Sequence, residues 1–191
     1  PADADFLKKN AEVAENYLML GETDEAEKLF RELAELQPEY LPAHVGLLRV
    51  ALETGDRSGE VRARRSLARL HAARREWEKA TEQAQKWLEL EPDSGEAKAV
   101  LAECTLASGD VEAAMYEFMA VADQCEAQGD FSGAVAAYMR ADELQRELGV
   151  DVVDVHPHVV RAWQAAGRTE DAIEYLINRG ERAARETQFE R

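Results

Sequence analysis

The chain has few cysteines, prolines and aromatic residues, and it has no long hydrophobic run. Its 191 residues include two cysteines, five prolines and 11 glycines, and aromatic residues make up 7%. Two cysteines allow one disulfide at most, and nothing in their spacing supports it. Because helix breakers are scarce, long helices can form. No run of about 18 apolar residues occurs, so the sequence predicts no membrane-spanning helix.

Basic residues are also scarce. The chain has 23 lysines and arginines against 39 aspartates and glutamates, which gives a net charge of −16. Nucleic acid and anionic membranes repel such a chain unless it carries a separate basic patch. We therefore expect neither a nucleic-acid partner nor insertion into a membrane. The composition, 46% apolar and 32% charged, is that of a globular protein.

A six-residue turn signature recurs along the chain. It starts with glycine or a substitute, continues with polar residues and ends in alanine. It reads GETDEA from Gly21, REWEKA from Arg75, GDVEAA from Gly109, GDFSGA from Gly129 and GRTEDA from Gly167, with a degenerate copy, GDRSGE, from Gly55. Glycine can end a helix in the left-handed conformation, and the polar residues can cap and charge the next helix. A small alanine lets two helices approach closely. The signature therefore predicts helices joined by tight turns.

Apolar spacing between the turns predicts ten helices and no strand. The apolar faces of the first two helices are Val13, Tyr17 and Leu20, and then Ala26, Phe30, Leu33 and Leu36. The expected ranges are 4–20, 23–37, 42–54, 57–74, 76–90, 95–108, 111–128, 131–148, 157–166 and 170–186. The prolines stand where these helices start or stop. We expect one all-α domain, 1–191, built as a stack of antiparallel helices.

The turns recur at intervals of 34, 20, 34, 20 and 38 residues, and 34 residues make one helical hairpin. With this spacing, the sequence resembles the tetratricopeptide repeat (TPR) family, whose loose pattern is matched by Tyr17, Ala26, Phe30, Leu33 and Pro38. Candidate repeats are 7–40, 61–94, 95–128 and 153–186, with irregular helices between them. Residues 41–60 fit half a repeat.

The resemblance implies a TPR-like α-solenoid, a right-handed superhelix whose concave face binds a peptide, a helix or another protein segment. It also implies an adaptor, scaffold or assembly factor that is not an enzyme and needs no cofactor. One variant of the family holds a C-terminal carboxylate with lysine and asparagine. Ala11 and Glu15 stand at matching positions here, so the sequence does not support that clamp.

The segment Arg57–Arg75 holds seven arginines and one acidic residue. At 100° per residue, Arg62, Arg65 and Arg69 share one side of a helix, which we call the arginine stripe. The residues expected to face the core are Ala63, Leu67, Leu70 and His71. The stripe is either a solvated face paired with neighbouring acids or a docking site for an acidic segment, because guanidinium groups bind carboxylates bidentately. Trp77, next to these arginines, is either an interface anchor or a core residue. We take the stripe and Trp77 as the candidate partner-binding residues.

Two other interpretations stay open. The chain could be a metal-binding or enzymatic domain that uses His156 and His158. Further metal ligands would have to come from elsewhere, so we expect an inter-helix loop and no metal. The chain could also be a structural segment of a larger protein or assembly, or associate with itself, by stacking through its terminal helices. The apolar residues for such stacking are Leu7, Leu18, Met19, Ile173, Ile177 and Phe189.

The cysteines give a weak indication of the compartment. Cys104 and Cys125 lie 21 residues apart with no C-x-x-C motif, so we expect two small apolar residues in helix interfaces. Their scarcity favours a reducing compartment, and we expect the cytoplasm. A removed signal or a longer parent chain stays open.

Overall fold

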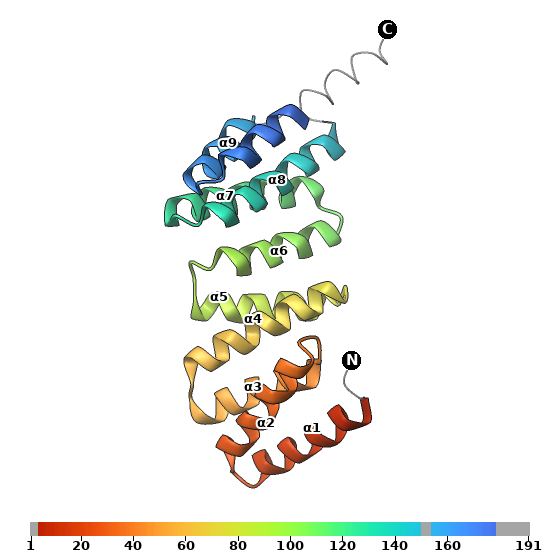
Figure 1. Cartoon of the computed structure of the whole chain (residues 1–191). Coiled ribbons are helices and arrows are strands. Elements are labelled where there is room, and N and C mark those ends of the chain that lie inside the picture. Colours follow the sequence, from red (N-terminus) through yellow and green to blue (C-terminus); the bar gives the residue numbers. More distant parts are fainter. Residues whose placement is uncertain (1–3, 150–153, 179–191) are drawn as a thin grey trace. The chain divides into compact units, whose positions relative to one another are not determined.

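The computed structural model describes residues 4–149 and 154–178, and within these ranges it is α-helical without strands (Figure 1). The helices are α1 Ala4–Met19, α2 Thr23–Leu36, α3 Leu41–Thr54, α4 Arg57–Ala73, α5 Trp77–Leu90, α6 Gly95–Ala107, α7 Val111–Gln128, α8 Phe131–Leu148 and α9 His156–Ala165. Residues 169–178 are helical as well. The all-α fold is confirmed, and the expected end of the last helix at 186 lies outside the described residues.

The chain divides into two compact units. Unit 1 comprises residues 1–107 and contains α1–α6, and unit 2 comprises residues 108–191 and contains α7–α9. The expectation of one domain stays a prediction. None of the helices in the described ranges is long and apolar enough to cross a membrane.

The turn signature has the predicted geometry in each complete copy. Its first residue has a positive φ, between 60° and 94°. The alanine five positions later is at most 2% exposed. At the first turn, Gly21 N donates to Leu18 O and Glu22 N donates to Tyr17 O, both at 3.0 Å. This pair of bonds satisfies carbonyls at the end of the helix. Side-chain capping is rarer than the signature predicts.

A side-chain cap occurs at two of the three turns in which aspartate follows glycine, whereas Asp56 after Gly55 makes no such bond. The carboxylates of Asp110 and Asp130 accept backbone N–H bonds at 3.0 Å from Ala113 and Gly133. Glu22 and Glu76 make no such bond at the same position. The longer glutamate side chain is a poor N-cap, and it contributes its negative charge near the helix N-terminus instead.

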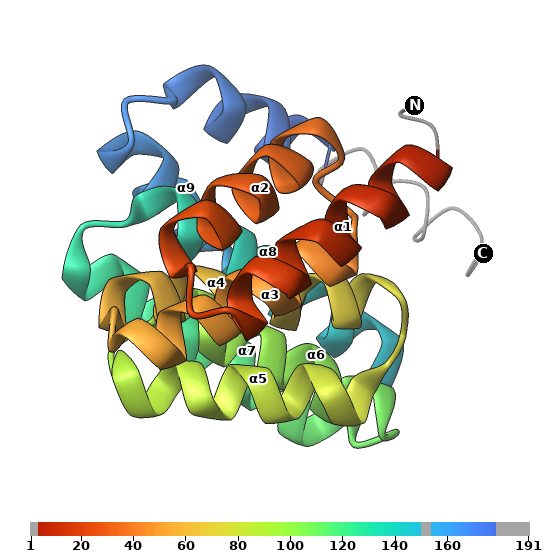
Figure 2. The ribbon, with the colours of Figure 1, turned by 90° about the horizontal axis from the view of Figure 1, so that it is seen from below.

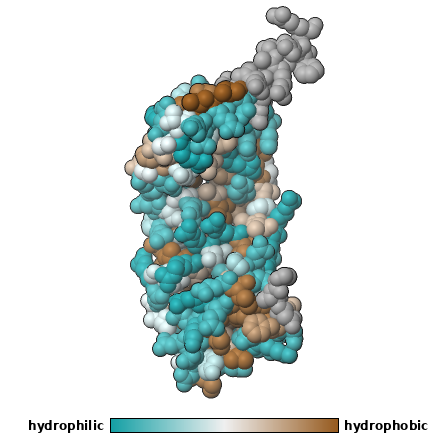
Figure 3. All heavy atoms as spheres, in the orientation of Figure 1, coloured by the Kyte–Doolittle hydropathy of each residue, from teal (hydrophilic) through white to brown (hydrophobic). Residues whose placement is uncertain are grey.

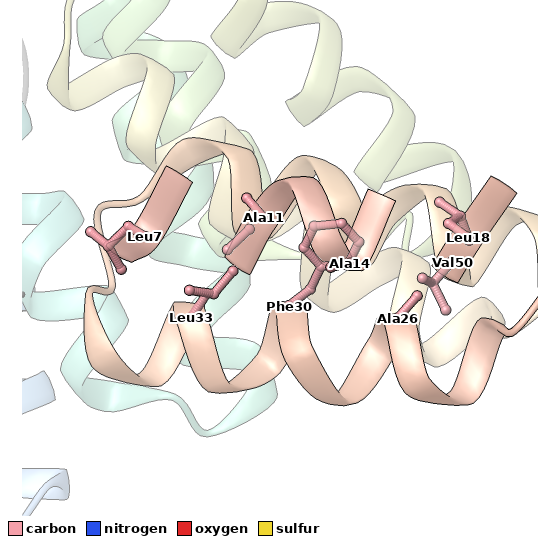
Figure 4. Packing of buried hydrophobic residues seen from close by; sticks show 9 residues of the cluster. Leu7, Ala11, Ala14, Leu18, Ala26, Phe30, Leu33 and Val50 are labelled. Atoms are coloured by element: carbon pink, nitrogen blue, oxygen red, sulfur yellow. The ribbon is translucent and has the colours of Figure 1, made fainter. Parts of the chain in front are cut away.

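A ring at the centre of α1–α3 fills the first core. Phe30 of α2 lies against Ala14 of α1 (Figure 4) and is fully buried. On the other side, α3 approaches so closely that a Cβ added to Gly46 would lie 2.4 Å from ring atoms of Phe30. Glycine at position 46 is therefore what lets α3 pack onto this ring.

The covered face of α1 differs from the expected one. Leu7, Ala11, Ala14 and Leu18 are buried, whereas Val13, Tyr17 and Leu20 are exposed, as is Leu36 of α2. The prediction for these four exposed residues was wrong, and so was the expectation that Leu7 and Leu18 form an open end. The alanines on the covered face allow the close approach of α2, which larger side chains would prevent.

Unit 1 consists of two groups of three helices. In each group the first helix also contacts the third. Every helix packs against its neighbours in sequence, and in addition α1 contacts α3 and α4 contacts α6. Ion pairs cross both of these contacts, between Arg49 and Glu15 and between Arg65 and Glu96. No comparable contact joins α3 to α5. We call α1–α3 the first triplet and α4–α6 the second triplet. Odd-numbered helices meet in the first triplet and even-numbered helices in the second.

A polar network joins the helices of unit 2. The buried Tyr138 hydroxyl donates to Asp123 at 2.6 Å and lies 3.1 Å from Glu126. Arg161 of α9 binds both carboxylate oxygens of Glu126, at 2.6 and 2.8 Å. Burial and these carboxylates raise the pKa of Tyr138, while the Arg161 hydrogen bond lowers the pKa of Glu126. Trp163 of α9 is buried as well.

Candidate functional site

The arginine stripe lies on the exposed side of α4. Arg62, Arg65 and Arg69 are all exposed, as 100° spacing predicts. The opposite side holds the buried Ala63, Leu67 and His71, with Leu70 half-buried. The structure therefore brings the three predicted arginines together on one helix face, and whether this face binds a partner stays a prediction.

The three arginines differ in how they are held. Arg65 donates to Glu96 of α6 at 2.5 Å, and its guanidinium carbon lies 5.9 Å from the centre of the Trp87 ring. Arg62 donates to Ser58 at 2.6 Å and lies 3.5 Å from Asp56. Among the residues that the structure describes, Arg69 has no ion pair or hydrogen-bond partner. Its guanidinium therefore offers all of its donors to an incoming carboxylate.

Other arginines of the same segment stabilise the fold. Arg64 is 8% exposed, pairs with Glu60 at 2.6 Å and donates to Gln83 of α5 at 3.1 Å. Arg57 donates to the Leu90 carbonyl at 3.0 Å, and Arg74 donates to the Glu39 carbonyl at 2.7 Å. Of the two sequence interpretations, pairing with an acid on a neighbouring helix describes Arg65, whereas Arg69 has no such pair in the described part of the chain.

Trp87 is the tryptophan under the stripe. It is 2% exposed, and its indole N–H donates to Glu91 at 2.9 Å. This ring therefore belongs to the core of the second triplet. Trp77 is half-buried at the first residue of α5, where its carbonyl lies 3.8 Å from the Cys104 sulfur. Sequence reasoning named Trp77 and missed Trp87 as the aromatic neighbour of the arginines.

The two histidines near the start of α9 take part in ring contacts. His156 hydrogen-bonds to the Tyr175 hydroxyl, and its Nε2 lies 3.6 Å from Asp142. His158 lies against Tyr138, with ring centres 5.2 Å apart. Within the described part of the chain, no group of three or more metal-ligating side chains comes together. Burial raises the pKa of Tyr175 to about 12, which keeps its hydroxyl protonated.

The repeating unit is a helix, a left-handed turn residue and a second helix with a buried alanine five positions on. Complete copies of this unit start at residues 21, 75, 109, 129 and 167. Glu15 and Arg49, which pair across neighbouring hairpins, lie 34 residues apart. The chain has a TPR-like fold. Scans against protein-family models and against curated proteins find no match.

Several solved TPR-like structures are similar to this chain over most of its length. One is YrrB, described as a TPR protein with an unusual peptide-binding site. The two sequences are 18% identical, the match covers 83% of this chain and 90% of that chain, and the TM-score is 0.36. A putative kinesin light chain from Podospora anserina with nearly identical TPR-like repeats has 17% identity, 95% and 96% coverage, and a TM-score of 0.39. PilF of Pseudomonas aeruginosa has 14% identity, 97% coverage of both chains and a TM-score of 0.35. The TPR-like assignment rests on this chain's own hairpins.

Proposed function

We propose that this protein is a non-enzymatic protein–protein interaction module that binds an acidic segment of another protein along the arginine stripe. The TPR-like fold supports a role in protein–protein interaction. The observation that carries the acidic preference is the row of exposed arginines on α4, with Arg69 unengaged, in a chain of net charge −16. An adaptor or assembly factor is the corresponding cellular role, and the buried thiols Cys104 and Cys125 fit a reducing compartment such as the cytoplasm.

The stripe suits carboxylate recognition because part of it is ordered before binding. Arg65 is held between Glu96 and the Trp87 ring, so little side-chain entropy is lost when a partner docks. Arg62 and Arg69 lie on the same face and supply further guanidinium donors. The acidic remainder of the chain repels an acidic segment elsewhere, which favours this one location. The stripe lies next to the contact between α4 and α6 in the second triplet. We place the concave binding face there, and we propose Trp77 as a further contact.

The direct test is affinity capture from native extract at low and high salt. The bait is the whole chain, compared with the variant Arg62→Glu, Arg65→Glu, Arg69→Glu. We expect the variant to lose the captured partner, and high salt to release it from the unaltered chain, because exposed charges are screened. Since Arg65 also pairs with Glu96, the single variant Arg69→Glu is included, and it should weaken capture without altering the fold.

A matched control reverses three exposed cations elsewhere. Lys8, Lys28 and Arg31, each replaced by glutamate, change the net charge by the same amount without touching α4. Capture that survives this control and fails with the stripe variant supports the proposed site. Capture that survives both would show that the partner docks on another face. Circular dichroism of all variants confirms that loss of capture is not loss of folding.

A further inference from the structure

A second apolar surface runs along the uncovered side of α1, independent of the arginine stripe. Figure 2 shows α1 in front of the other helices of unit 1, and Figure 3 shows apolar areas at this end of a mostly hydrophilic surface. The large exposed residues are Phe6, Val13, Tyr17 and Leu20, at 50%, 44%, 36% and 77% exposure, and we call them the α1 stripe. At 100° per residue all four lie within about 60° of one another.

The spacing of this stripe matches that of a helix-packing seam. Phe6, Val13 and Leu20 follow one another at intervals of seven, and Asn10 and Tyr17 lie between them at alternating steps of four and three. Steps of four and three keep one face towards a partner helix along its whole length. The expected occupant is therefore another helix rather than an extended segment.

Phe6, Val13 and Leu20, three of the four stripe residues, are also spaced symmetrically, which selects a second copy of this chain as the occupant. Val13 stands midway between Phe6 and Leu20, so two antiparallel α1 helices crossing at Val13 would pair each Phe6 with the other copy's Leu20. A two-fold interface needs this self-complementarity, in which the same patch serves both copies. We propose that the protein forms an isologous dimer through the α1 stripes, with Val13 on the two-fold axis.

Charge favours this pairing in an otherwise self-repelling molecule. Lys9 pairs with Asp5 at 2.7 Å, so the border of the stripe is close to neutral. An antiparallel pair keeps the acidic turns at Glu22 of the two copies apart, whereas a parallel pair places them together. The antiparallel arrangement also brings opposite ends of the two helix dipoles together.

The available area is that of a modest, reversible dimer. The four exposures correspond to roughly 400 Å² of apolar surface per copy, or about 800 Å² for two copies before flanking residues are counted. Specific interfaces generally bury more than about 1,000 Å² in total, and the flanking Asn10 and Asn16 would add to the buried area. The dimer should therefore dissociate on dilution.

Sedimentation of the whole chain over a range of concentrations tests the association. We expect a mass that doubles reversibly as concentration rises. Val13→Glu places two carboxylates face to face on the axis and should weaken dimerisation at least about tenfold. Leu52→Glu is the matched control, an exposed leucine on α3 outside the stripe, and it should leave the dimer intact. A chain that stays monomeric throughout, or a dimer that Val13→Glu leaves unchanged, would overturn the proposal.

Single cysteines distinguish the antiparallel geometry from its alternatives. Under mild oxidation, Val13→Cys should cross-link to itself, while Phe6→Cys alone should not. A mixture of Phe6→Cys and Leu20→Cys should form the mixed dimer. The unaltered chain is the blank, because Cys104 and Cys125 are buried. Self-cross-linking of Phe6→Cys would show a parallel pair and would contradict the two-fold axis at Val13.

Discussion

The two triplets of unit 1 use the same hairpin and build different surfaces from it. Each contains a left-handed turn residue, Gly21 in one and Arg75 in the other, followed five positions later by a fully buried alanine. Each has one large buried ring, Phe30 or Trp87. Yet α1 meets α3 in the first triplet, whereas α4 meets α6 in the second. The turn signature therefore determines the hairpin. It does not determine whether the odd-numbered or the even-numbered helices contact each other.

Different side-chain contacts accompany the α1–α3 and the α4–α6 contact. In the second triplet, Arg64 is buried and binds Gln83, which ties α4 to α5, and Arg65 reaches Glu96 on α6. In the first triplet, Phe30 occupies the space that Gly46 leaves open, and α3 closes onto α1 through Arg49 and Glu15. In the second triplet the even-numbered helices α4 and α6 contact each other, and the exposed arginines lie on α4. We place the docking site there.

The largest expected effect comes from removing the central ring of either triplet. Phe30→Ala and Trp87→Ala should each lower the free energy of unfolding by about 3–5 kcal/mol, because each leaves a cavity in a close-packed core. Denaturant unfolding of the two variants measures the loss. Trp77→Ala is the control, since that ring is half-buried, and a loss for Trp77→Ala larger than for Trp87→Ala would contradict the assignment of the core.

Gly46→Ala should destabilise the first triplet. Helix propensity alone predicts a gain of about 1 kcal/mol from this substitution. The new Cβ would lie 2.4 Å from the buried Phe30 ring, and we expect overpacking to prevail with a net loss of about 1–3 kcal/mol. The sign of the change in unfolding free energy decides between the two effects. Val45→Ala, at an exposed site on the same helix, should change stability by less.

Arg75→Gly should stabilise the second triplet. Arg75 has a φ of 60°, whereas glycine occupies the same position in the first triplet. Replacing a left-handed residue that has a Cβ with glycine should raise the unfolding free energy by about 1 kcal/mol. Arg75→Ala removes the same charge but keeps the Cβ, so it should not show this gain. An equal gain from both variants would point to charge rather than backbone strain.

The smallest expected effect is the pH dependence of the turn between α4 and α5. Hydrogen bonds from Lys79 and His71 lower the pKa of Glu76 below its ordinary value of 4.5. Because the folded state holds the carboxylate more strongly, its stabilising effect is present above the ordinary pKa and is lost as pH falls through the lowered one. The stability difference between the unaltered chain and Glu76→Gln should therefore shrink below about pH 4. A difference that stays constant with pH would contradict this.

The helices were predictable from the sequence because their signals are local. The turn glycines, the alanines five positions later and the prolines all act within one or two helical turns, and the ten expected ranges follow from them. The covered face of α1 was not predictable in this way. The α1 stripe contains the larger apolar residues, but the alanines at 11 and 14 let α2 approach the opposite face.

The candidate site likewise has features that local helix geometry predicts and features that depend on packing between helices. That Arg62, Arg65 and Arg69 share a face follows from helix geometry alone. The burial of Arg64 and the position of Trp87 beneath Arg65 depend on packing between helices and on partners such as Glu96, 31 residues further along the chain. Hydropathy ranks an arginine as exposed and does not show which one is held between two helices.

The central claim is that α1 contacts α3 and α4 contacts α6, whereas no comparable contact joins α3 to α5. Cross-linking pairs of cysteines within one chain tests it most directly. A regular 34-residue repeat would bring Gln83 next to Arg49, just as Arg49 lies next to Glu15. We expect a short cross-linker to join Glu15→Cys with Arg49→Cys, and Arg65→Cys with Glu96→Cys, but not Arg49→Cys with Gln83→Cys. Joining of the 49–83 pair, without the 65–96 pair, would show that the same layer stays closed throughout and would contradict the placement of the docking face.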